Sequence, residues 1–188
     1  MSVLRKLALF IVIAAVTNVA IVAALPQLIN RYVTHRIVAR ALEQNPNATV
    51  RERGGYNVAL PAPRADAAAR WVVRPSPDML YTVCVFDISE RPLRITAPVQ
   101  DSYVSVAGFA ADTNNFFAIN DSQLPAGPDG SKHFDVVLAK AAAPDLPAAP
   151  LIIPPSTRGL ILFRSLIPSD ADLQRLRQFQ SEQRCDPL

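Results

Sequence analysis

The run LYTVCVFDI at residues 80–88 alternates between two sets of side chains, as a β-strand does. One set comprises Leu80, Thr82, Cys84, Phe86 and Ile88, and the other comprises Tyr81, Val83, Val85 and Asp87. Both sets are mostly apolar, which is typical of a strand covered on both faces. The run therefore predicts a central strand of a sheet.

Short apolar runs recur at short intervals on both sides of this strand, and Pro, Gly, Asn and Asp separate them. The runs cover residues 71–73, 93–96, 103–109, 116–119, 134–139, 151–153 and 159–167. Such spacing is typical of an antiparallel β-sandwich or barrel. The strand–helix–strand units that build a parallel sheet are absent from the sequence.

A short helix is expected near the C-terminus. Ser169 can cap it, and Asp172 stands three residues later as an acidic variant of the capping box. Leu173, Leu176 and Phe179 form an apolar stripe, which we expect to pack on the sheet.

Residues 7–25 read LALFIVIAAVTNVAIVAAL and carry no charge. At 1.5 Å per residue this run spans about 28 Å, close to the hydrocarbon thickness of a bilayer. Arg5, Lys6 and the small residues at 22–24 also fit a cleavable signal peptide, although the run is long for one. A soluble core helix would show an amphipathic stripe, which is absent. We expect residues 1–6 to be a short tail and residues 7–25 an uncleaved anchor whose partner is the lipid bilayer.

Residues 26–47 follow the anchor as an amphipathic helix. Pro26 ends or kinks the apolar run, and Asn45-Pro46-Asn47 stops the helix. The segment suits a stalk between membrane and body, or a helix that lies on anionic headgroups. Residues 48–188 then form the β-rich body. The expected fold class is mainly β: an antiparallel sandwich-like or barrel-like domain preceded by a transmembrane helix and closed by a short C-terminal helix.

The positive charge of the chain is confined to its N-terminal segment. Residues 1–44 contain five Lys and Arg and one acid, a net charge of +4, whereas residues 45–188 contain 14 basic and 15 acidic residues, a net charge of −1. A body without a basic excess argues against nucleic acid as a partner. Arg5 and Lys6 directly before the span favour an internal N-terminus. We expect a single-pass protein of the bacterial inner membrane with a periplasmic body.

Recognisable catalytic and metal-binding patterns are absent. The two histidines, His35 and His133, are too few for a transition-metal site, and we expect neither a metal nor a cofactor. No GxSxG elbow occurs, and Ser76 stands between two prolines. The aspartates do not form a spacing that identifies a glycosidase pair, and the Asp112-Thr113-Asn114 stretch fits a turn better than a calcium loop.

The two cysteines allow one disulfide. Cys84 lies inside the predicted central strand and Cys185 lies near the C-terminus. In an oxidising compartment the pair could join the tail to the sheet, whereas in the cytosol both thiols would stay reduced.

The segment at residues 72–121 resembles the bacterial domain of unknown function 1254. The resemblance is carried by SPDMLYT at residues 76–82, FDI at residues 86–88, Pro92, Pro98, Tyr103 and DTN at residues 112–114. It implies a β-rich domain of exported or envelope proteins without an established catalytic role. Longer members carry a second β-rich domain, the domain of unknown function 1214. The chain looks like a short, membrane-anchored form, so the resemblance suggests a separate 1214-like polypeptide as a partner.

Two interpretations of the SPD segment remain. Its prolines and Asp78 suit a rigid turn that leads Tyr81 into the sheet. Alternatively, Arg74, Asp78, Tyr81 and Asn114 form a ligand site. The leading hypothesis for the whole protein is an envelope binding or assembly module rather than an enzyme. The alternative is a membrane-tethered enzyme that acts on an envelope carbohydrate or lipid through Asp and Arg residues.

Overall fold

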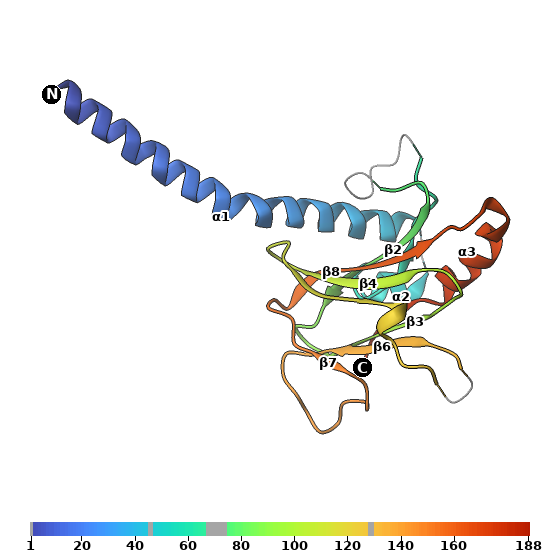
Figure 1. Cartoon of the computed structure of the whole chain (residues 1–188). Coiled ribbons are helices and arrows are strands. Elements are labelled where there is room, and N and C mark those ends of the chain that lie inside the picture. The colour runs from blue at the N-terminus through green and yellow to red at the C-terminus, as the bar shows by residue number, and fades with distance from the viewer. Residues whose placement is uncertain (1, 45–46, 67–74, 128–129) are drawn as a thin grey trace.

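The body of the protein is built from two facing β-sheets, as the sequence predicted. The computed structural model describes residues 2–44, 47–66, 75–127 and 130–188, and nine strands lie within these ranges (Figure 1). The five-stranded sheet has the order β1 (Leu60–Pro61), β2 (Met79–Asp87), β8 (Arg158–Leu166), β4 (Val104–Ala110) and β5 (Asn115–Asn120). The four-stranded sheet has the order β7 (Leu151–Ile152), β6 (His133–Leu138), β3 (Leu93–Pro98) and β9 (Arg184–Pro187). Neighbouring strands are antiparallel, apart from the parallel pair β6 and β7.

The main hydrophobic core lies between the two sheets. Phe86 of β2, Phe163 of β8 and Phe134 of β6 are fully buried in it. Alternate residues of β2 face this core, and the intervening residues Val83 and Val85 face the opposite side. Strand β2 is therefore covered on both faces, which confirms the prediction from residues 80–88.

A single long helix, α1 (Val3–Gln44), covers the outer face of the five-stranded sheet with its C-terminal half. Ile37 packs there against Val83 and Val85. The part of the apolar stripe that contains Val33 and Ile37, which suited either a stalk or a helix on headgroups, is thus covered by the body itself, whereas Leu28 and Tyr32 stay exposed. The helix continues through Pro26, and Figure 1 shows that it changes direction partway along its length.

The N-terminal half of α1 projects away from the body (Figure 1). All of residues 2–25 are exposed, including large apolar side chains such as Phe10 and Val16. The helix is long and apolar enough to cross a bilayer.

Smaller elements complete the body. Helix α2 (Ala48–Glu52) is capped by Asn47, whose side-chain oxygen accepts a hydrogen bond from the Val50 N–H at 2.8 Å. The 3-10 turn η1 (Asp121–Gln123) follows β5. A second 3-10 turn, η2 (Asp170–Asp172), precedes α3 (Leu173–Glu182), whose Leu176 is buried against Leu80 and Ile167.

Two details near the C-terminus differ from the sequence prediction. Ser169 does not cap the helix, because α3 begins at Leu173; its hydroxyl instead donates to the Asp172 carboxylate at 2.8 Å. The residues after α3 form a strand that the sequence pattern did not predict, because β9 pairs with β3 at the sheet edge.

Candidate functional site

Of the four residues proposed as a ligand site, the structure places three, and Asn114 does not lie near Asp78 and Tyr81. Asp78 and Tyr81 lie where β2 begins, next to the end of β8 at Leu166, whereas Asn114 follows β4 at the opposite end of the sheet. The sheet places about seven residues of β8, or about 23 Å, between these ends. Arg74 lies outside the described residues. Sequence separation could not reveal this distance, because it depends on the pairing of β2 and β4 with β8.

Asp78 and Tyr81 have structural contacts in the turn before β2. The Ser76 N–H donates to the Tyr81 hydroxyl at 2.9 Å, and the Ile167 N–H donates to the Asp78 carbonyl at 2.8 Å. Asn114 donates in turn to the Asp112 carboxylate at 2.7 Å. These contacts fit the rigid-turn interpretation of the SPD segment.

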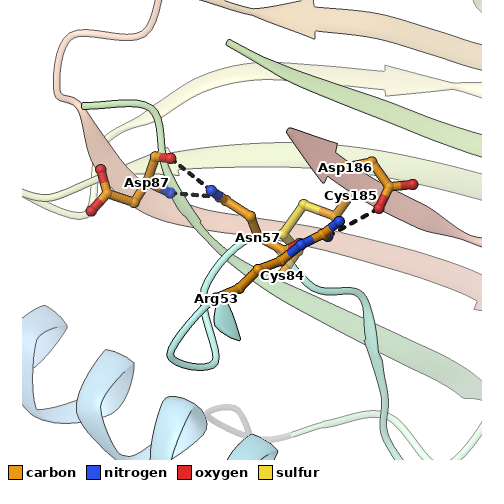
Figure 2. Close-up of a disulfide and its surroundings, with 6 residues drawn as sticks. All are labelled: Arg53, Asn57, Cys84, Asp87, Cys185 and Asp186. Atoms are coloured by element: carbon orange, nitrogen blue, oxygen red, sulfur yellow. Dashed lines mark hydrogen bonds and ion pairs between the residues drawn. A yellow bond between two sulfur atoms is a disulfide. The ribbon is translucent and has the colours of Figure 1, made fainter. Parts of the chain in front are cut away.

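Cys84 and Cys185 are joined by a disulfide between the two sheets. Cys84 lies in β2 and Cys185 in β9, their Cα atoms are 6.6 Å apart, and both side chains are fully buried in the main core (Figure 2). Beside the bridge, Arg53 forms an ion pair with Asp186 at 3.0 Å. The C-terminal strand is therefore held by a covalent bond, an ion pair and a strand ladder.

Asn57 organises the C-terminal end of β2, at Asp87. Its side-chain amide donates to the Asp87 carbonyl and its side-chain oxygen accepts from the Asp87 N–H, both at 2.8 Å (Figure 2). Asn57 has a φ of 54°, a left-handed conformation that asparagine tolerates better than most residues. The side chain thus extends the ladder of β2 and fixes the backbone at Asp87.

The Asp87 carboxylate pairs with Arg158 across the β2–β8 ladder at 2.7 Å. Burial alone would raise the pKa of Asp87, but hydrogen bonds from Ser89 and Arg158 outweigh it and hold the pKa below its ordinary value. The carboxylate is therefore ionised at neutral pH. The Arg158 guanidinium also lies over the Tyr56 ring, 5.7 Å from its centroid.

Two neighbouring cavities share Tyr56 and Arg158. The first, which we call the Asp87 cavity, has a volume of about 490 Å³. Its charged lining consists of the cations Arg53, Arg91 and Arg158 and the anions Glu52, Asp87 and Glu90. The Asp87 cavity is therefore balanced in formal charge.

The second cavity, which we call the α1 cavity, lies between α1 and the start of β8 and has a volume of about 370 Å³. Its lining contains Arg31, His35 and Arg158 but no acidic residue. Within the described part of the chain, neither Arg31 nor His35 has an ion-pair partner. This cavity is thus the more basic of the two.

Hydrogen bonds fasten α1 to the rim of the α1 cavity. The Asn30 amide donates to the Ala110 carbonyl at 2.7 Å, and Thr34 donates to Asn30 at 3.0 Å. Ser156 accepts from the Ala111 N–H at 2.9 Å and donates to the Arg158 carbonyl at 2.7 Å. The wall that carries Arg31 and His35 is therefore tied to the sheet.

Sequence reasoning missed Asn57, Arg158 and the cavity role of Arg31. The four-residue spacing of Arg31 and His35 on one helix face was a usable signal. The contributions of Asn57 and Arg158 depend on contacts with Asp87, which lies 30 residues from Asn57 and 71 residues from Arg158, and no local pattern encodes these contacts.

Comparison with known proteins gives a family but no activity. Residues 56–187 match a family described as a protein of unknown function, DUF1254. No curated protein matches the chain.

Among solved structures, that of the VPA0106 protein from Vibrio parahaemolyticus is similar with a TM-score of 0.55 and 14% identity, over 89% of this chain and 38% of that one. The structure of an uncharacterised protein from Burkholderia cenocepacia has a TM-score of 0.45 and 13% identity, over 87% of this chain and 49% of that one. This chain thus spans less than half the length of either protein. At such low identity the Vibrio likeness concerns the fold alone.

Proposed function

The chain belongs to the DUF1254 family, and from that premise we propose that it is a single-pass membrane protein whose β-body is a binding or assembly module. The observation that carries the proposal is the division of α1 into two halves. The first half exposes apolar side chains throughout, and the second half is packed on the five-stranded sheet. Exposing such a surface to water is costly, and a bilayer removes that cost.

The continuity of α1 supports a body held close to the bilayer. Leu25 is the last residue of the apolar run, and Asn30 is already hydrogen-bonded to Ala110, the last residue of β4. Five residues of helix rise about 7.5 Å. The end of the sandwich that carries both cavities therefore faces the bilayer surface in this proposal.

We propose that the body lies on the periplasmic side of the bacterial inner membrane. Two features support this orientation. Arg5 and Lys6 precede the apolar run, as in exported bacterial chains. The Cys84–Cys185 disulfide suits an oxidising compartment, because thiols of the cytosol are kept reduced.

Membrane extraction tests the proposed anchor. We expect the full-length protein to stay in the membrane pellet after washes with high salt and with alkaline carbonate, and to enter solution only with detergent. Salt removes proteins held by charge, so a basic surface alone would not give this result. Release of the intact protein, with residues 1–25 attached, by either wash would refute the anchor.

A second β-rich polypeptide resembling the domain of unknown function 1214 is the partner that we propose. The Vibrio neighbour is much longer than this chain, and β5 lies at an edge of the five-stranded sheet, where a partner strand could pair. The detergent extract of the anchor test also tests this proposal: we expect such a polypeptide to co-purify, and its absence from a mild extract contradicts the pairing.

A further inference from the structure

We propose that the α1 cavity binds a phosphate group, presented by an anionic phospholipid headgroup or as free phosphate. The inference deepens the proposed function and rests on it for the position of the bilayer. The two cavities differ in charge. The Asp87 cavity matches each cation with an anion, whereas the α1 cavity is lined by Arg31, His35 and Arg158 without an acidic residue.

The charge of the α1 cavity comes mainly from Arg31. Arg158 is already paired with Asp87, which is ionised, so its charge is largely offset. Arg31 has no such partner within the described residues and stands four residues before His35, on the same helix face. A guanidinium presents several N–H donors in a planar fork that matches the oxygens of a phosphate.

One neutral donor completes the lining. The Thr157 hydroxyl borders the cavity, and no hydrogen bond that involves it occurs within the described residues, whereas the hydroxyls of Thr34 and Ser156 already donate to Asn30 and to the Arg158 carbonyl. The cavity volume of about 370 Å³ lies within the range of small-molecule binding pockets. The site therefore offers both charge and hydrogen-bond donors to an oxyanion.

The level of the cavity along α1 matches the headgroup region of a bilayer. Arg31 follows Leu25 by six residues, a rise of about 9 Å. The apolar side chains near Arg31 are exposed: Leu28 is 58% exposed, Ile29 is 49% exposed and Tyr32 is 64% exposed. Exposed apolar residues that end in a tyrosine next to arginines are typical of the membrane–water interface. A lipid phosphate would lie at this height.

Titration of the full-length protein in a non-ionic, phosphate-free detergent tests the inference. The probes are inorganic phosphate, dihexanoyl phosphatidylglycerol and the zwitterionic dihexanoyl phosphatidylcholine, each followed by calorimetry. We expect saturable binding of phosphatidylglycerol at one site and clearly weaker binding of phosphatidylcholine. If inorganic phosphate competes with phosphatidylglycerol, a phosphate group alone is sufficient for binding. If only phosphatidylglycerol binds, the ligand is the lipid headgroup. Absence of saturable binding of both anionic probes overturns the inference.

Two arginines of α1 provide a matched pair of variants. Arg31→Gln removes the unpaired cation of the cavity. Arg36→Gln removes an equal charge from a position that is exposed as Arg31 is but does not line the cavity, and the Arg36 guanidinium lies over Tyr32. We expect about a tenfold loss of affinity for Arg31→Gln, as for a lost charge-assisted hydrogen bond, and less than about a twofold loss for Arg36→Gln. Equal losses for both variants would mean diffuse attraction to a basic helix and would overturn the site.

A third variant should act in the opposite direction. Asp87→Asn leaves an oxygen for the Ser89 N–H but removes the charge that offsets Arg158. We expect a several-fold gain in phosphate affinity, and a loss would contradict the electrostatic account. These titrations use solubilised protein and do not depend on the anchor. Failure of the titrations therefore refutes the phosphate site, and failure of the extraction test refutes the anchor.

Discussion

Replacing Phe86 with alanine is expected to lower the free energy of unfolding by about 3–5 kcal/mol. The Phe86 side chain is fully buried between the two sheets. Its ring also lies against Gly159 of β8, where an added Cβ would meet both this ring and the Phe109 carbonyl. The neighbouring backbone cannot easily collapse into the space that the ring leaves, so most of the cavity cost should remain. Urea unfolding of the full-length protein in detergent, followed by near-ultraviolet circular dichroism, measures the change.

Phe116 provides the matched control for Phe86. The two rings touch edge to face, with centroids 6.1 Å apart, but Phe116 lies on the edge strand β5 and is only partly buried. We expect Phe116→Ala to cost clearly less than Phe86→Ala. If Phe86→Ala does not fold, Phe86→Leu is expected to fold with a smaller loss. Equal and small losses for the Phe86 and Phe116 variants would contradict a core packed between two sheets.

Removal of the Cys84–Cys185 disulfide, by the paired change Cys84→Ala and Cys185→Ala, is expected to lower the free energy of unfolding by about 2–5 kcal/mol. The bridge joins positions that are 101 residues apart in sequence, so it restricts a large part of the unfolded chain. It also joins the C-terminal strand β9 to β2 of the opposite sheet. Urea unfolding with and without a reductant measures the effect.

The double variant supplies its own control for the disulfide. A reductant should destabilise the wild-type protein and leave the double variant unchanged. Mass analysis under non-reducing conditions should find no free thiol in wild-type protein taken from its native compartment. Two free thiols in that protein, or stability that is insensitive to reductant, would contradict a structural role for the bridge.

The sheet architecture could be predicted from local patterns because its strands are short apolar runs between turn residues. Residues 80–88 even revealed that β2 is covered on both faces. The sequence could not predict that α1 covers the outer face of β2, because the apolar stripe around Val33 and Ile37 would suit a membrane surface as well as a sheet. Strand β9 was missed because four residues that include a proline and two charges give no strand signal.

The candidate site was harder to predict than the fold. Its residues come from α1, the segment around Tyr56, and β8, which only the tertiary structure brings together. Asp78 and Asn114 are polar residues typical of turns, and both make local turn contacts: the Asp78 N–H donates to the Ser76 hydroxyl, and the Asn114 amide donates to the Asp112 carboxylate. Local polarity indicated turns correctly, but it carried no information on which turns lie close together.

Labelling of engineered cysteines in intact cells tests most directly the claim that the protein is anchored in the inner membrane with its body on the periplasmic side. Ala126→Cys places a thiol on an exposed loop of the body, and Ser2→Cys places one at the exposed start of the chain. The wild-type cysteines are buried and bonded, which leaves a low background for a membrane-impermeant maleimide. The account predicts that the reagent labels Ala126→Cys in intact cells and Ser2→Cys only after the inner membrane is permeabilised. Labelling of Ser2→Cys alone in intact cells, or of neither variant before permeabilisation, would contradict it.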